Sequence, residues 1–481
     1  METRQYLTGI AMNHTAQTET AEDFELADYQ PEVRRVAGVQ CSVTRDSAFL
    51  EEGTLEVSGC VLYTVVYLGG EGGLSSVPLF SAWSAKIPIP EGAGIGVEDM
   101  HITCEGENVT CRVTGPRKLS LSARVKVRCM ALGETDCSTE AAERAVYRME
   151  ETPVVHLKTC RCTGTVAGET GGGKVISCRG MVQITDARRT VEGIAVTGEA
   201  AVRFLVQGDG GNYVPVRSRM PIAETIPCPK MPEEAGNETV TAGGKCAALT
   251  VTEGEDGVIR WEMEYDLEAA LCGEGKSVRA ADGYCTTHGD IPQFRQAESI
   301  TGGRCIRGQV TLSGEKGLRT EDSRNLQFLY GWGRGVFEKG EILPGGHLQL
   351  TGTAYCTALL TGNGDVLTEE AALPIRYECD MALPGGYVPD CRCSFTIWDV
   401  GGHLEGETLH LHAEAGCDGI VLLSAPCRWL SGMEIGEPLP KPKPAVVLYT
   451  PDAGETMWDV QKRYRTDAVE EWEGKYVVDV K

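Results

Sequence analysis

The stretch LEVSGCVLYTVVY (residues 55–67) decides how this sequence folds. Counted by twos from its first leucine, every residue on one side is apolar except Gly59. A period of two is typical of a β-strand that buries one face. A lone glycine inside such a strand marks a β-bulge or a close approach of another backbone, so we expect one or the other at Gly59.

Two later segments align with the first when one glycine in each serves as the anchor. They are IAVTGEAAVRFLV (residues 194–206), anchored on Gly198, and LQLTGTAYCTALL (residues 348–360), anchored on Gly352. Each segment is followed by a Gly/Asn/Asp cluster, which supplies the positive φ angles of tight turns, and then by a strand that contains proline. Because proline has no amide donor, these return strands are expected to be edge strands, or the prolines to lie at strand ends.

Each unit closes with another alternating pair of segments, in residues 109–127, 247–267 and 393–416. The predicted fold class is therefore mainly β, with three consecutive β-sandwich-like repeats and a small βααβ domain at the end. The predicted limits are residues 1–150, 151–295 and 296–436 for the repeats, 437–444 for a Pro-rich linker and 445–481 for the last domain. Residues 140–149 (EAAERAVYRM) are either a short helix between two repeats or the beginning of a strand.

Composition limits the classes of function. The formal net charge of −24 argues against a nucleic acid or an anionic bilayer as partner, because phosphate binding depends on lysine and arginine. No run of about 18 apolar residues predicts a transmembrane segment, and no signal peptide is evident, so we expect a cytoplasmic chain. The 20 cysteines include no C-x-x-C pair. We interpret most of them as small buried hydrophobic residues, and a minority as possible cross-links in an oxidised assembly.

The sequence offers no catalytic set, so we predict no enzyme, no cofactor and no metal site. The segment GETGGGKV (residues 168–175) resembles a phosphate-binding loop, but Val175 stands where a hydroxyl would hold Mg²⁺, and we predict a hairpin turn. His410 and His412 alternate on one strand without a third ligand at diagnostic spacing. A hydrolase or nucleotide enzyme therefore ranks behind the two binding functions considered below.

The chain ends in a segment of different character. PLPKPKP (residues 438–444) predicts a stiff spacer that gives the following domain reach. A short strand follows, and Thr456 is placed to cap a helix with Asp459 as its capping-box partner. A second helix is predicted over residues 467–472, ended by Gly474, and a return strand over residues 476–480. The apolar face of the first helix is predicted to consist of Met457, Val460 and Tyr464.

This order and the letters LYTPDAGETMWDVQKRYRTDAVEEW (residues 448–472) resemble the LysM module. The matching positions are Gly454, Thr456, Trp458, Val460 and Tyr464. The resemblance implies a ligand site between the loop before the first helix and the loop after the second. The residues it assigns to that site are Gly454, Glu455, Thr456, Met457, Trp458, Glu473, Gly474 and Lys475. LysM modules bind glycans that contain N-acetylglucosamine, but the usual asparagine-containing stretch is replaced here by WEGK (residues 472–475), which makes a protein ligand plausible as well.

The repeats in turn resemble SPOCS repeats, the β-domains of spore coat assembly proteins. The resemblance rests on ADYQPEVRRV (residues 27–36), the glycine-anchored strand, the glycine-rich turn and the proline-containing return. Three such repeats before a LysM domain are similar to coat morphogenetic proteins of the SipL/SpoVID type. This implies a non-enzymatic adaptor in the mother-cell cytoplasm, at the forespore surface and in the spore coat. Its implied partners are the coat basement-layer ATPase (SpoIVA type) and other coat proteins, and the alternative is a peptidoglycan-binding anchor.

Overall fold

The computed structural model describes residues 5–70, 72–90, 94–208, 210–233, 235–254, 256–318, 326–362, 365–379, 387–440, 443 and 445–480. The fold is mainly β, as predicted. The first copy of the repeated unit contains β1 (Tyr6–Glu25), β2 (Val33–Glu51), β3 (Thr54–Gly69), β4 (Leu74–Pro88), the 3₁₀ turn η1 (Val97–Asp99), β5 (Met100–Gly115) and β6 (Lys118–Asp136). The second contains β7 (Ala145–Gly171), β8 (Lys174–Arg189), β9 (Ile194–Gln207), β10 (Tyr213–Ile226), β11 (Gly236–Glu253) and β12 (Val258–Cys285). The third contains β13 (His288–Gly317), β14 (Gln327–Ile342), β15 (Leu348–Gly362), β16 (Asp365–Cys379), β17 (Val388–Glu405) and β18 (Thr408–Pro438).

One topology occurs three times. In each copy the second, third and fourth strands form one antiparallel sheet, in the orders β2-β3-β4, β8-β9-β10 and β14-β15-β16. The first, sixth and fifth strands form the other sheet, in the orders β1-β6-β5, β7-β12-β11 and β13-β18-β17. The boundaries predicted at 150/151 and 295/296 fall inside β7 and β13, respectively.

The three glycine-anchored segments are the central strands β3, β9 and β15, and every alternate residue predicted to be buried in them is buried. A β-bulge in the preceding strand lies opposite each anchoring glycine. A Cβ at Gly59, Gly198 or Gly352 would lie 2.0, 2.3 or 2.2 Å from a carbonyl oxygen of that strand. Both predicted reasons for the glycine, the bulge and the close approach, are therefore confirmed.

The proline-containing return strands β4, β10 and β16 are each at a sheet edge, which confirms that prediction. Of the two possibilities for residues 140–149, the beginning of a strand is the observed one, because β7 begins at Ala145 and the described residues 137–144 before it contain no helix. The glycine-rich segment 168–175 connects β7 to β8, which lie in different sheets, so its interpretation as a hairpin turn is wrong. The described residues that follow it, 174–207, form the strands β8 and β9, so no helix N-terminus is placed there to receive a phosphate.

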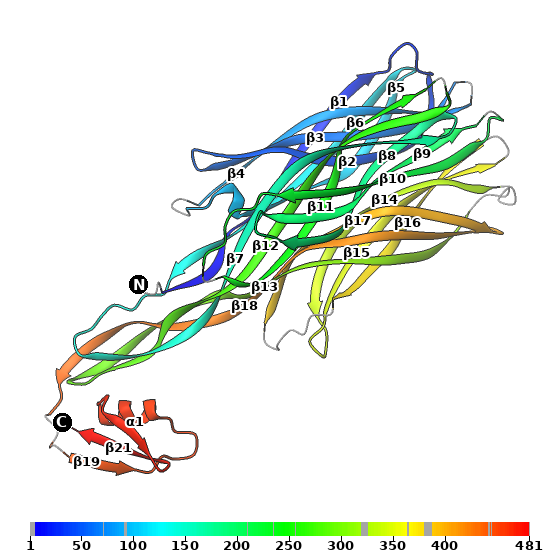
Figure 1. The fold of residues 1–481 in the computed structure, drawn as a ribbon. Coiled ribbons are helices and arrows are strands. Elements are labelled where there is room, and N and C mark those ends of the chain that lie inside the picture. The colour runs from blue at the N-terminus through cyan, green and yellow to red at the C-terminus, as the bar shows by residue number, and fades with distance from the viewer. Residues whose placement is uncertain are drawn as a thin grey trace.

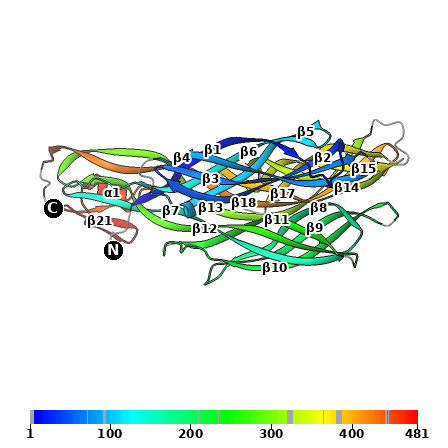
Figure 2. The ribbon, with the colours of Figure 1, turned by 90° about the horizontal axis from the view of Figure 1, so that it is seen from above.

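The three copies pack against one another and are not separated by linkers (Figures 1 and 2). Each copy has its own apolar core between its two sheets. Two further buried clusters combine residues of all three copies; one includes Val66, Leu205 and Trp332, and the other includes Met130, Cys272 and Leu422. Burial of these shared clusters stabilises the three copies as one body.

Four strands extend from this body as a narrow stem (Figure 1). Residues 145–153 of β7 pair with residues 276–285 of β12, and residues 288–297 of β13 pair with residues 427–438 of β18. The chain passes from the last of these strands toward the C-terminal module, which lies beside the end of the stem (Figure 1). No helix in the described part of the chain has the length and apolar character needed to cross a membrane.

Candidate functional site

The C-terminal module is a small sheet covered by one helix. It contains β19 (Ala445–Tyr449), α1 (Met457–Tyr464), β20 (Val469–Trp472) and β21 (Lys475–Val480), and the sheet order is β19-β21-β20. Its core consists of the buried side chains of Val460, Val469 and Val478. Met457 and Tyr464 pack against this core, so the apolar helix face predicted from the sequence is confirmed.

Helix α1 begins at the predicted capping box. The backbone amide of Asp459 donates to Thr456 Oγ1 at 3.4 Å, and the amide of Thr456 donates to Asp459 Oδ2 at 2.8 Å. These reciprocal bonds satisfy two amides that the first turn of a helix leaves without a partner. They also lower the pKa of Asp459, because the hydrogen bonds from Thr456 stabilise its carboxylate. Thr456 is thus engaged in starting the helix.

The second predicted helix is wrong. Residues 469–472 form the strand β20, which pairs with β21, so the module has the order βαββ in place of βααβ. Glu473 and Gly474 form the two-residue connection with φ angles of 49° and 74°, a backbone that favours glycine. A six-residue helix would leave most of its backbone groups without partners, whereas the hairpin pairs them in a ladder. Gly474 therefore shapes a strand turn and does not end a helix.

The two predicted ligand loops lie at the same end of this sheet. Tyr449, the last residue of β19, pairs with Tyr476, which lies two residues after the turn at Gly474. The loop that follows β19 contains Gly454, whose φ is 86°, and Glu455. The carboxylate of Glu455 accepts a 2.8 Å hydrogen bond from Tyr449.

Glu455 also forms a 2.6 Å ion pair with Arg463 of α1. Both contacts of the Glu455 side chain, with Tyr449 and with Arg463, are thus made within the module. In contrast, Glu473, Gly474 and Lys475 are exposed, as are Gly454 and Thr456. A ligand at this end of the sheet would therefore meet mainly backbone and the turn after β20.

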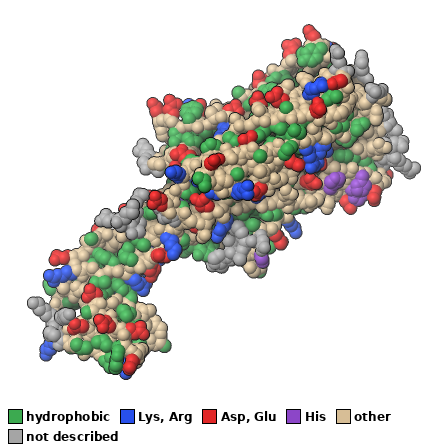
Figure 3. Space-filling model, in the orientation of Figure 1, with side chains coloured by type: hydrophobic (Ala, Val, Ile, Leu, Met, Phe, Trp, Pro, Cys, Tyr) green, Lys and Arg blue, Asp and Glu red, His purple; other side chains and the backbone are tan. Residues whose placement is uncertain are grey.

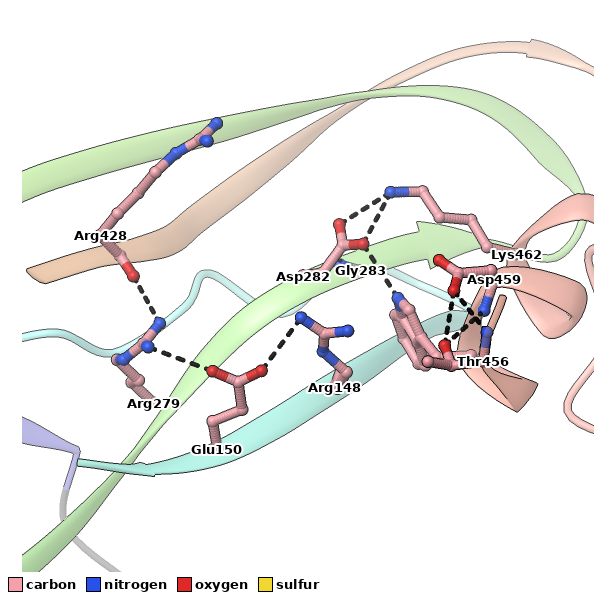
Figure 4. A network of polar contacts seen from close by, with 10 residues as sticks. Arg148, Glu150, Arg279, Asp282, Gly283, Arg428, Thr456, Asp459 and Lys462 are labelled. Carbon is pink, nitrogen blue, oxygen red and sulfur yellow. Dashed lines mark hydrogen bonds and ion pairs between the residues drawn. The ribbon is translucent and has the colours of Figure 1, made fainter. Parts of the chain in front are cut away.

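Trp458 and Lys462 point toward the stem rather than toward these loops. The indole nitrogen of Trp458 donates to Asp282 Oδ2 at 2.9 Å. Lys462 Nζ lies 2.8 Å from both carboxylate oxygens of Asp282. Figure 4 shows Asp282 on β12 facing Lys462, with Thr456 and Asp459 at the beginning of α1. Burial alone would raise the pKa of Asp282, but the hydrogen bonds from Lys462 and Trp458 bring it below its ordinary value.

A second group of contacts flanks the first. The ring of Tyr284 lies 5.3 Å from that of Trp458, and its hydroxyl donates to the carbonyl of Thr466 at 3.0 Å. Burial raises the pKa of Tyr284 to about 12, so its hydroxyl stays protonated as this donor requires. Arg465, in the left-handed position that ends α1, forms an ion pair with Asp290, whose side chain is only 3% exposed. We call these contacts to Asp282, Tyr284 and Asp290 the junction.

The junction changes the expected role of the spacer. The sequence predicts that the proline-rich segment gives the module free reach, and residues 441, 442 and 444 of that segment lie outside the described residues. In the structure one face of α1 packs on the module's own sheet and another on the stem. The module is therefore held in one orientation by specific polar contacts. Sequence reasoning missed Asp282, Tyr284 and Asp290 because nothing local links a strand 170 or more residues upstream to the tail.

The sheet face opposite α1 remains open. Leu448 pairs with Val477, which pairs with Glu470, and Trp472 is two residues further on the same side. The exposed fractions of Val446, Leu448 and Trp472 are 72%, 51% and 53%. Figure 3 shows hydrophobic and acidic side chains together on the surface of this module. We call this surface, made of Val446, Leu448, Trp472 and Val477, the outer face.

Other chemistry is sparse in the described part of the chain. Within it, no three His, Cys, Asp or Glu side chains gather as a metal site would require. The ring centroids of His403 and His410 are 5.0 Å apart, and the rings are stacked. His410 also contacts the carboxylates of Glu315 and Glu405.

Comparisons of this chain with protein-family models, with curated proteins and with solved structures found no match.

Proposed function

We propose that this chain is a non-enzymatic adaptor of spore coat assembly, which docks on the coat basement-layer ATPase (SpoIVA type) through its C-terminal module. The proposal takes the partner, the mother-cell location and the SPOCS and LysM assignments from the resemblance in the sequence. It rests on one observation: a module of 36 described residues exposes several large apolar side chains together on its outer face. Contiguous exposed apolar surface on a small module is typical of a protein interface.

The geometry of the junction supports a protein ligand over a glycan. Trp458, the residue best suited to stack on a sugar ring, donates to Asp282 and lies against Tyr284. Within the described part of the chain, the side chains of Trp472 and Leu448 make no comparable contact with the stem, and they are exposed. Acidic Glu470, Glu471 and Glu473 surround Trp472, so the partner surface is expected to carry lysine or arginine around an apolar centre.

The test is binding of the full chain to the purified coat ATPase. We expect Leu448→Glu and Trp472→Ala to weaken binding at least about tenfold, because central aromatic and aliphatic anchors carry much of the energy of an interface. Phe80→Ala is the matched control, since Phe80 is 51% exposed but lies on β4 of the body. Equal binding by the outer-face variants and the wild type would contradict the proposal.

The second candidate function is a peptidoglycan-binding anchor. It is favoured by the placement of the loop at Gly454 and the turn at Glu473–Gly474 at one end of the sheet, as a glycan between two loops requires. Titration of the full chain with chitooligosaccharides would distinguish the two. Binding that is lost in a Gly474→Asp variant and kept in Trp472→Ala would support the anchor, whereas binding of the ATPase alone would support the adaptor.

A further inference from the structure

A cavity lies between the second and third copies. It has a volume of ≈ 220 Å³ and is lined by residues of β8 and β11 from the second copy and of β13, β17 and β18 from the third. The lining residues Thr185, Gln309 and Thr396 are exposed, so the cavity is open to solvent. One water takes about 30 Å³ of the liquid, and pockets for drug-sized ligands begin near about 300 Å³. The size therefore suits one small molecule.

Two side chains bring opposite charges to this cavity. Arg307 on β13 and Asp418 on β18 both line it, and they are direct partners in the antiparallel pairing of these strands. Directly opposite residues leave the same face of a sheet with their Cβ atoms about 5 Å apart, and opposite charges at such positions attract. Within the described part of the chain, however, no ion pair joins Arg307 to Asp418.

Each of the two charged groups is held by another residue and keeps one atom free. Asp418 Oδ1 accepts from Ser394 Oγ at 3.1 Å, and Arg307 Nη2 lies 3.6 Å from Asp186 Oδ1. Arg307 Nη1 is buried and has no hydrogen-bond partner among the described residues. Asp418 Oδ2 is on the side of Gly243, another lining residue, where a Cβ would lie 3.3 Å from it. Because glycine has no side chain there, this oxygen is left accessible from the cavity.

The unpaired atoms define the chemistry of a matching ligand. A buried charge without a partner costs free energy, and burial accordingly raises the pKa of Asp418 to about 6. A cation alone would pair with Asp418 and leave Arg307 unmatched, whereas an anion alone would do the reverse. A molecule that carries both charges satisfies both side chains. The walls beside them include the buried apolar side chains of Val182, Ile184 and Trp398, which suit a short aliphatic group.

We propose that this cavity binds a small aliphatic amino acid as its zwitterion, at a site separate from the proposed adaptor function. The ammonium group donates to Asp418 Oδ2, the carboxylate accepts from Arg307 Nη1, and the aliphatic side chain packs against Trp398. Since residues of both copies line the cavity, the bound amino acid contacts the second and the third copy at once. A ligand that binds only the folded chain raises its melting temperature, so the amino acid stabilises the packing of these two copies.

The test is calorimetric titration of the full chain with L-valine at pH 8, where Asp418 is ionised. We expect saturable binding of one valine per chain, with a dissociation constant of about 1 mM or lower. Two analogues serve as matched ligands: isobutylamine lacks the carboxylate of valine, and isovalerate lacks its ammonium group. Each is expected to bind at least about tenfold more weakly than valine, because it leaves one charged side chain without a partner.

Three variants assign the contacts. Asp418→Asn and Arg307→Gln are each expected to weaken valine binding at least about tenfold. Arg304→Gln is the control, because Arg304 is also on β13 but pairs with Glu274 and is 43% exposed, and it should bind valine as the wild type does. Circular dichroism checks that each variant is folded.

Three results would overturn the inference. The first is no saturable binding of valine by the folded wild type, as expected if Arg307 and Asp418 pair directly in solution. The second is binding of isobutylamine or isovalerate as tight as that of valine. The third is unchanged valine affinity in folded Asp418→Asn or Arg307→Gln.

Discussion

Replacing Asp282 by alanine tests whether the junction holds the C-terminal module on the stem. The carboxylate accepts from Lys462 at 2.8 Å and from Trp458 at 2.9 Å, and its side chain is 19% exposed. Hydrogen bonds to a charged group each contribute about 1.5–3 kcal/mol, but Lys462 is 37% exposed and recovers part of its hydration when released. We therefore expect docking to weaken by about 2–3 kcal/mol in total, or roughly 30- to 150-fold in the docked-to-undocked ratio.

Hydrogen–deuterium exchange of the α1 amides provides the assay. The module is small, so its helix is expected to exchange mainly after it leaves the stem, and Asp282→Ala should speed that exchange by up to the same factor. Asp256→Ala is the matched control, because Asp256 forms a 2.7 Å ion pair with Arg260 near the other end of β12 with both side chains 51% exposed. Exchange in β9 of the body should not change in either variant.

The pH dependence of docking has a defined sign. The pKa of Asp282 is lowered from 3.8 in the folded protein, so its contribution to docking is fully present above that value and is lost only as the pH falls through the lower folded pKa. Exchange of α1, corrected for the chemical rate, should therefore be unchanged between pH 7 and 5. Equal exchange of α1 in Asp282→Ala and the wild type, or release of the module already at pH 5, would refute this account of the junction.

Three further predictions concern the body and the turn of the module. Gly198→Ala should lower the free energy of unfolding by about 2 kcal/mol or more, because the new Cβ would lie 2.3 Å from the carbonyl oxygen of Gln183. Denaturant titration measures this loss, and Gly171→Ala is the control, because a Cβ at Gly171 would meet no atom within 4 Å. Asp418 lines a cavity of ≈ 220 Å³ between the second and third copies, and burial raises its pKa to about 6. Because the folded protein binds this proton more tightly than the unfolded chain, the stability that protonated Asp418 contributes is lost as the pH rises from about 4 to 6. Asp418→Asn should therefore raise the melting temperature at pH 8 and leave it nearly unchanged at pH 4. Gly474→Ala should cost the β20–β21 hairpin about 1 kcal/mol, because φ at this position is 74°, and faster amide exchange in β21 would report it.

Sequence patterns were enough to predict three features of the repeated unit. The period of two, the anchoring glycine and the proline of the return strand predicted the buried face, the bulge and the sheet edge at Gly59, Gly198 and Gly352. These features depend only on local geometry. Side chains alternate between the two faces of a strand, glycine lets the neighbouring backbone approach, and proline cannot donate a hydrogen bond to a neighbouring strand. The capping box at Thr456 is local in the same sense.

The structure differs from the sequence-based prediction where pairing or contact with another segment decides the outcome. Residues 469–472 have a helix-compatible sequence, but β21 offers them a ladder, and pairing with a neighbouring strand outweighs weak intrinsic preference in so short a segment. The orientation of the C-terminal module was also beyond local patterns, because Asp282 and Asp290 reach it only after β12 and β13 have extended from the body. The sequence by itself thus determined the central strand and the proline-containing edge strand of each copy, and which face of the central strand is buried. Only the tertiary structure decided which surface of the last module is taken by the stem and which is left exposed, because that depends on contacts between residues more than 170 positions apart.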